Sequence, residues 1–242
     1  MIGILRAEFL KIRTIRAVWV LGGFIVAIPM LVVMLTPSPT GELLLNSAIP
    51  SILLMGVIGV MCSTQEYSQG TIRITLAAVP RRARVFVAKV AVAVAVAVVL
   101  SVVLLLMAHV TQMGETSWDL LEHPRNISAY VLVACMTSVI GVVLGLLLRS
   151  SPGAITAIIL WPTLLENIVA ALLGLAFDID LLSRNSLPFQ AGFVAITRDM
   201  GVEPGTEPVV VGASWGAGLG TLAAFMAALA ILSFASFSRR DA

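Results

Sequence analysis

Six long apolar segments, separated by shorter polar stretches, set the pattern of this 242-residue chain. They cover residues 17–35, 43–62, 85–110, 127–148, 154–177 and 209–237. Each is close to the ~20 residues that a helix needs to cross the core of a bilayer. Residues 91–99 alternate between Ala and Val like a strand, but they lack a polar face, and an isolated strand in lipid would leave its backbone unpaired. The pattern therefore predicts an all-α integral membrane protein with six transmembrane helices in a single membrane domain.

Residues 1–16, which precede the first apolar segment, predict a helix at the membrane interface. Four apolar residues are spaced three or four apart and therefore share one face: Ile2, Leu5, Phe9 and Ile12. Four basic residues can reach lipid phosphates while their stems cover apolar surface: Arg6, Lys11, Arg13 and Arg16. We expect this helix to anchor the chain, and a partner-binding role is the alternative.

The composition excludes a soluble protein, because 59% of the residues are hydrophobic and 12% are charged. Soluble domains are about 45–50% apolar and about 25% charged. Twelve of the fifteen Lys and Arg residues fall on the side of the N-terminus; the exceptions are Arg125, Arg184 and Arg198. The positive-inside rule then predicts that both termini are cytoplasmic. The excess of Arg over Lys and the many Ala and Val residues fit a bacterium with a GC-rich genome, and hence a bacterial cell membrane.

The predicted outer loops are residues 36–42, 111–126 and 178–208. Within the last, residues 187–200 predict a short amphipathic helix on the outer surface, and a plain polar loop is the alternative. The final span carries a small residue at every fourth position: Gly212, Gly216, Gly220, Ala224 and Ala228. Gly141 and Gly145 repeat this spacing in the fourth span. Such faces let helices approach closely, and we expect the contact to lie within the subunit, with a dimer contact as the alternative.

Glu166 is the only ionisable residue deep inside a predicted span, and Asn167 follows it. Intramembrane charges are rare, costly and often functional, so both residues are candidates for a substrate pathway. The alternative is a structural, protonated glutamate that hydrogen-bonds neighbouring helices. Polar residues expected at a comparable depth, where they could hydrogen-bond Glu166, are Ser101, Thr137 and Ser138.

Nothing in the sequence predicts an enzyme, a metal site or a bound cofactor. The only lysines, Lys11 and Lys89, do not follow a glycine-rich turn, so no phosphate-binding loop is recognisable. His109 and His123 do not have the spacing of a zinc site. If ATP and Mg²⁺ are used, they bind to another chain.

The polar stretch between the second and third spans, EYSQGTIRITLAAVPRRARVFVAK at residues 66–89, holds a third of the Lys and Arg residues. Gly70 predicts a turn, and the Thr71 hydroxyl can cap a short helix after it. This helix should end near Val79, because the residue before a proline avoids the α conformation, and Pro80 suits the start of the next helix. We expect the charged residues of this loop to be solvated.

This loop resembles the first cytoplasmic loop of type-2 ABC transporter permeases. The matching residues are Glu66, Gly70, Thr71, Arg73, Leu76, Pro80, Arg81 and Lys89. Residues 7–21 are similar to the entry helix of that family, and residues 187–196 to the segment before its last span. The resemblance implies that residues 63–84 form a loop with a coupling helix that docks on the ATPase. Its coupling residues would be Glu66, Gly70, Thr71, Arg73, Leu76, Pro80 and Arg81.

The resemblance also implies the permease subunit of an ATP-driven exporter. Its expected partners are two copies of a P-loop ATPase, a second identical or related permease, and membrane lipids, with no nucleic acid. An amphipathic or hydrophobic substrate, such as a drug, lipid or peptide, fits a pathway with a single carboxyl group. The alternative is a membrane scaffold or immunity protein that binds a cytoplasmic partner and transports nothing.

Overall fold

A computed structural model describes residues 2–78, 82–112, 118–177, 187–198 and 214–240. These residues form helices and no strand: α1 Ile2–Thr14, α2 Arg16–Leu35, α3 Gly41–Ser47, α4 Ile49–Ser68, α5 Ile72–Ala78, α6 Arg82–Thr111, η1 Leu120–Glu122, α7 Pro124–Leu148, α8 Ser151–Leu160, η2 Trp161–Leu165, α9 Glu166–Phe177, α11 Pro188–Thr197 and α12 Trp215–Arg240. Six stretches of the described chain are long and apolar enough to cross a membrane. The all-helical fold and the number of spans are confirmed.

The bundle is centred on α4 and α7, which pack closely through small residues. A Cβ atom on Gly141 of α7 would collide with the carbonyl of Gly56, and one on Gly59 would collide with the carbonyl of Ser138. The small-residue spacing predicted for the fourth span thus acts within the subunit.

The small residues of α12 behave differently. No atom would lie within 4 Å of a Cβ added to Gly216 or Gly220, so the expected packing within the subunit is wrong for both. Gly218 makes the close contact instead, against the Ala191 carbonyl of α11. Its position is two residues out of phase with the predicted series, whose first member, Gly212, lies outside the described residues.

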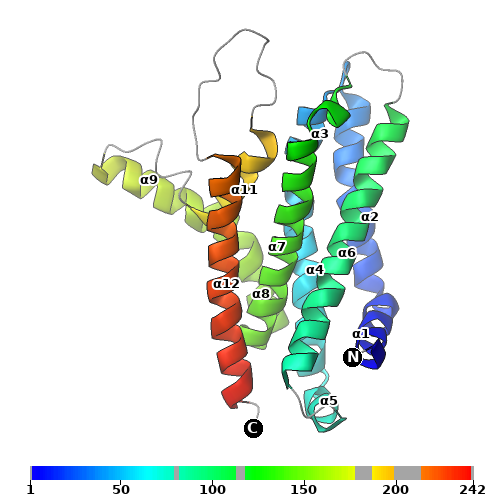
Figure 1. Ribbon diagram of the computed structural model, residues 1–242, viewed down its shortest axis with the longest axis vertical. Helices are drawn as coiled ribbons and strands as arrows, with labels where there is room; N and C mark the ends of the chain where they lie inside the picture. Colours follow the sequence, from blue (N-terminus) through cyan, green and yellow to red (C-terminus); the bar gives the residue numbers. More distant parts are fainter. Residues whose placement is uncertain (1, 79–81, 113–117, 178–186, 199–213, 241–242) are drawn as a thin grey trace.

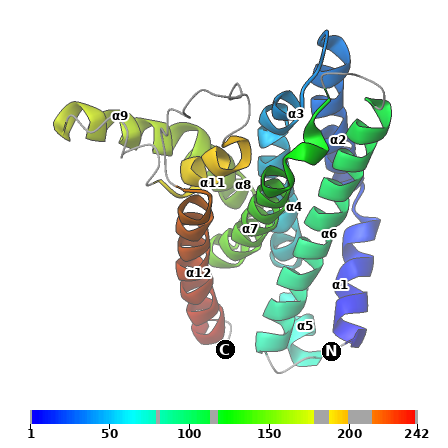
Figure 2. The same ribbon diagram turned by 45° about the horizontal axis from the view of Figure 1, so that its top comes forward.

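The fifth span is broken, and the predicted continuous helix over residues 154–177 is corrected. It consists of α8, the π-helical segment η2 and α9. Pro162 lies in η2, where a proline removes a backbone donor and its ring clashes with the preceding turn. Figures 1 and 2 show α9 leaving the bundle and running crosswise to α12.

A helix, α11, is present within the predicted residues 187–200, but it is buried rather than laid on the surface. Phe189, Ala191, Gly192, Ala195 and Ile196 of α11 are all buried. They pack mainly against α7 and α12. The rest of the predicted outer loop, residues 178–186 and 199–208, lies outside the described residues.

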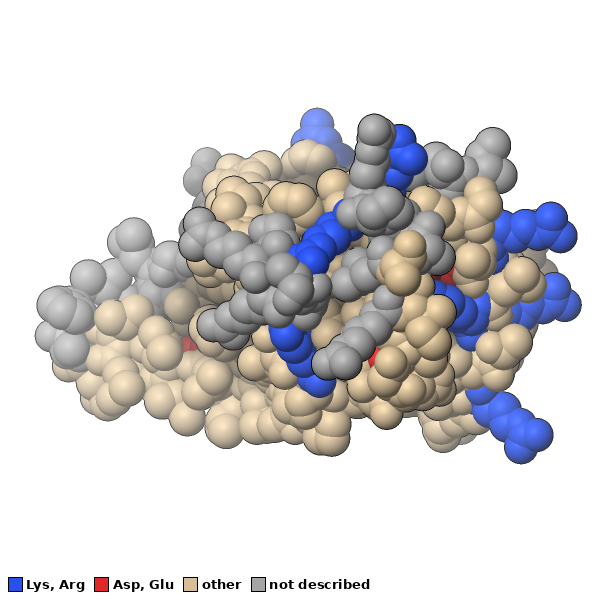
Figure 3. All heavy atoms as spheres, turned by 90° about the horizontal axis from the view of Figure 1, so that it is seen from below, with Lys and Arg blue, Asp and Glu red and all other residues tan. Residues whose placement is uncertain are grey.

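The start of α1, the end of α12 and the short helix α5 lie at the same end of the bundle (Figure 1). Figure 3 views this end and shows Lys and Arg side chains gathered over and around it. The termini therefore share one side, as six spans require, and the assignment of that side to the cytoplasm stays a prediction.

Candidate functional site

The short helix α5 follows a turn at Gly70, where φ is +67°, a conformation that glycine adopts without strain. The Thr71 N–H donates to the Glu66 carbonyl at 2.9 Å, and the Thr71 carbonyl accepts from the N–H groups of Ile74 and Thr75. The turn and the helix thus lie where the sequence predicted them. The loop is shorter than residues 63–84, because α4 continues to Ser68 and α6 begins at Arg82. Of the predicted coupling residues, Pro80, Arg81 and the side chains of Arg73 and Leu76 lie outside the described part.

Glu66 does not lie in a solvated loop, so that expectation is wrong. It occupies the last turns of α4, and only 4% of its surface is exposed. Its Oε1 atom accepts hydrogen bonds from Lys11 Nζ and from Thr75 Oγ1, the latter at 2.9 Å. Its Oε2 atom lies 2.9 Å from Lys89 Nζ. Glu66 is therefore a junction between α1, α4, α5 and α6.

Lys89, the last residue of the loop motif, is the buried counter-charge. It is 1% exposed and lies 3.1 Å from Glu8 Oε2 as well as near Glu66. Its ammonium group also donates to the Cys62 carbonyl at 3.2 Å. Two of these contacts are hydrogen bonds, and the contact with Glu66 is an ion pair.

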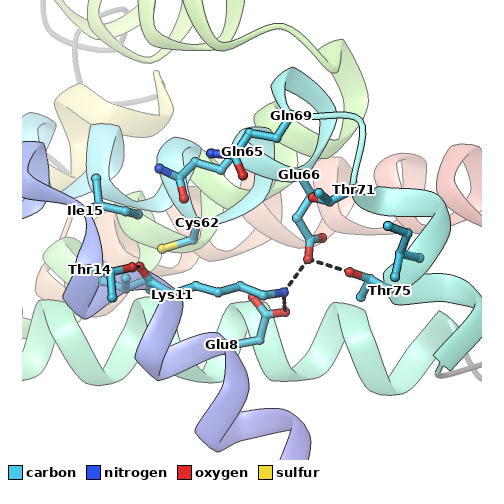
Figure 4. A pocket seen from close by; sticks show the side chains of 12 residues that line it. Glu8, Lys11, Thr14, Ile15, Cys62, Gln65, Glu66, Gln69, Thr71 and Thr75 are labelled. Atoms are coloured by element: carbon cyan, nitrogen blue, oxygen red, sulfur yellow. Dashed lines mark hydrogen bonds and ion pairs between the residues drawn. The ribbon is translucent and has the colours of Figure 1, made fainter.

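Glu8 and Lys11 of α1 complete the group. Lys11 Nζ donates to Glu8 Oε1 at 2.9 Å and also to Glu66. Each lysine therefore contacts both glutamates, and we call Glu8, Lys11, Glu66 and Lys89 the charge cluster. Figure 4 shows three of these residues, Glu8, Lys11 and Glu66. Burial lowers the pKa of Lys11, but its hydrogen bonds to Glu66 and Glu8 outweigh burial and raise the pKa above 10.5.

The buried face of α1 differs from the predicted one. Glu8 and Ile12 are buried, Leu5 and Ile15 pack against the core, and Phe9 points outward. The periodicity of apolar residues missed Glu8, because it assigns charged side chains to the surface. A usable signal was present: Glu8 is the only acidic residue before Glu42.

The charge cluster contains two positive and two negative side chains, so it is neutral as a whole. Removing one partner of a buried ion pair leaves an uncompensated charge, which costs about 3–5 kcal/mol. The cluster therefore makes the position of α1 against α4 and α6 depend on charge balance.

A pocket of about 420 Å³ opens beside the cluster, between α1, α4 and α5. Its polar lining includes Thr14, Gln65, Gln69, Thr71 and Thr75. In Figure 4 the Lys11 side chain extends along this pocket toward Glu66 and Glu8. Within the described residues, no group of three or more His, Cys, Asp and Glu side chains could hold a metal ion.

Glu166 is buried, with 2% of its surface exposed, but its partners are not those predicted. The backbone N–H groups of Phe189 and Gln190 donate to its Oε1 and Oε2 atoms at 3.1 and 2.9 Å. Ser101 and Ser138 make their hydrogen bonds elsewhere: to Met55 Sδ and to the Ala93 carbonyl. The expectation that they hydrogen-bond Glu166 is wrong.

The first turn of α11 explains why a carboxylate is needed there. Leu187 at the N-cap offers no side-chain acceptor, and Pro188 has no N–H, so the next two N–H groups lack a partner in their own helix. Glu166 accepts from both, at the end of the helix where unpaired N–H groups need an acceptor. Asn167 is exposed and donates to the Thr163 carbonyl of its own segment at 2.8 Å.

The sequence from residue 4 to residue 170 matches the family model described as ABC-2 family transporter protein. The chain belongs to this family. The family predicted from the loop motif is thereby confirmed, and the chain is a type-2 ABC transporter permease. The matched part of the permease includes α5 and the whole charge cluster, and it ends before α11 and α12. Comparison with curated proteins and with solved structures finds no match.

Proposed function

We propose that this permease is the membrane subunit of an exporter that moves an amphipathic or hydrophobic substrate outward across a bacterial cell membrane. A separate P-loop ATPase would hydrolyse ATP, and two ATPases would act with two permeases. Membership of the ABC-2 family and the six membrane-spanning stretches support this function.

The observation that carries the proposal is the exposed face of α5. Ile74 is 70% exposed at the end of the bundle that holds both termini, although it is a large apolar residue. Its neighbour Thr75 points the other way and donates to Glu66. Contiguous exposed apolar surface marks a protein–protein contact, and Ile74 supplies the described part of such a surface on α5. We assign Ile74 to the contact with the ATPase and Glu66 to the support of α5 from within.

The two pathway candidates then have different roles. Both carboxyl oxygens of Glu166 accept hydrogen bonds from α11. Glu166 would therefore affect the pathway indirectly, by fixing the position of that helix. Asn167 is exposed at the start of α9 and is the better candidate for contact with a substrate.

The test is copurification of the permease with a candidate P-loop ATPase from the same genome, comparing the wild type with Ile74→Asp. A charge in the centre of an apolar contact should weaken association by about tenfold or more. The matched control is Leu121→Asp, which adds the same charge to a residue that is 63% exposed in η1, away from α5. Equal ATPase binding by wild type and Ile74→Asp would overturn the assignment of α5. Binding without ATP-dependent transport would favour the scaffold alternative.

A further inference from the structure

We propose that α1 positions α5 through the charge cluster, with Glu8 and Lys11 acting as positioning residues for the contact with the ATPase. The role in transport depends on the proposed function, but the positioning of α5 can be tested without the ATPase. The predicted role of α1 was that of a membrane anchor, and this inference gives it a second task.

The first step is the dependence of α5 on Glu66. Among the described residues, α5 packs extensively against no other helix, although Ile72 in its first turn contacts the hydrophobic core. The hydrogen bond from Thr75 Oγ1 to Glu66 Oε1 ties it to the end of α4. A short helix with little packing is held by such individual contacts, so the orientation of the Glu66 carboxylate affects the order of α5.

The second step is the dependence of Glu66 on α1. Lys11 donates to the same oxygen, Oε1, that accepts from Thr75, and it also donates to Glu8. Lys89 holds the other oxygen of Glu66 and also pairs with Glu8. Displacement of α1 therefore removes the Lys11 donor from Glu66 Oε1, the same oxygen that accepts the hydrogen bond from Thr75 of α5. It also leaves Lys89 paired with one carboxylate instead of two.

The third step concerns charge. The cluster divides into two neutral pairs, Glu8 with Lys11 on α1 and Glu66 with Lys89 on α4 and α6. Substituting both residues of the α1 pair leaves a balanced pair behind, whereas substituting the buried Glu8 alone leaves an excess positive charge in the cluster. The double variant Glu8→Gln with Lys11→Met therefore removes the positioning contacts without unbalancing the core.

The experiment is hydrogen–deuterium exchange of the purified full-length permease in lipid nanodiscs, without ATPase. In Glu8→Gln/Lys11→Met and in Thr75→Val, amides 75–78 of α5 should exchange about tenfold faster, the size expected for losing a hydrogen bond to a charged group. Amides of α4 and α7, and the melting temperature, should not change, which separates positioning from general destabilisation. Thr14→Val is the matched control, since Thr14 lines the same pocket but donates to the Lys11 carbonyl of its own helix.

Faster exchange in Thr75→Val with unchanged exchange of α5 in the double variant would overturn the proposal, because α5 would then depend on Glu66 and not on α1. Loss of protection throughout the bundle in the double variant would overturn it as well. Transport per ATP hydrolysed, measured with the ATPase present, should fall in the same two variants. If the wild type neither binds the ATPase nor transports, the proposed function fails, and the exchange result still decides the role of α1.

Discussion

At the end of the bundle that holds both termini, Glu8 and Glu66 are buried against two lysines, whereas Glu166 is buried against two backbone N–H groups of α11. The lysines supply full opposite charges from other helices on long, adaptable side chains. The N–H groups supply partial charges in a fixed geometry. The first arrangement therefore depends on charge balance, and the second on the number and direction of acceptors.

The largest effect should come from Lys89→Met. This substitution leaves two buried carboxylates with only Lys11, which is half-buried and cannot replace a fully buried ammonium group. We expect the free energy of unfolding to fall by about 3–5 kcal/mol, measured by denaturant unfolding in detergent micelles.

The control is Lys89→Met combined with Glu66→Gln, which removes one charge of each sign and should recover most of the loss. If Lys89→Met alone unfolded at the same midpoint as the wild type, the charges of the cluster would not hold α1, α4 and α6 together.

Glu166→Gln should have the next largest effect, and it tests the other side of the comparison. Glutamine keeps the shape but places an NH₂ group against the Phe189 or Gln190 N–H, so one acceptor is lost and two donors face each other. We expect a loss of about 1–3 kcal/mol in the free energy of unfolding. Asn167→Ala is the control at the adjacent exposed residue and should change little.

If Glu166 were instead protonated and donated a hydrogen bond to another span, Glu166→Gln should lose no stability, because the glutamine NH₂ group can replace the acid as a donor. Unfolding of Glu166→Gln at the wild-type midpoint would therefore show that the bond to α11 does not require a carboxylate.

The sequence predicted the spans and α5 because these depend on local signals. Apolar length marks the helices, and the Gly70-Thr71 pair followed by Pro80 marks a turn and a short helix. The break in the fifth span was missed, although Pro162 was visible, because apolar length alone does not separate a straight helix from a bent one.

The charge cluster and the contact between Glu166 and α11 were missed for a different reason. The motif contained Glu66 and Lys89 without showing that they pair, and Glu8 lies 58 residues before Glu66 in the chain. The packing of α1 and α4 against α6 brings these charges together. Similarly, the need of α11 for an acceptor could be predicted from Pro188, but its position beside Glu166 could not, since it depends on the break at η2.

The smallest effect should come from Lys11→Met, which removes the half-exposed lysine of the charge cluster while Glu8 and Glu66 keep Lys89. We expect a loss of about 1 kcal/mol or less, because solvent screens a partly exposed pair. The folded-state pKa of Lys11 is raised above 10.5, so its contribution is fully present below pH 10.5 and is lost as the pH rises through the folded-state value. The difference in unfolding midpoint between wild type and Lys11→Met should thus be constant near neutral pH and shrink in strong alkali. Arg13→Met, which removes an exposed charge from the same helix, is the control and should show no such pH dependence. If Lys11→Met lowered the free energy of unfolding as much as Lys89→Met, both lysines would stabilise the cluster equally. That result would contradict the distinction between a buried and a partly exposed lysine.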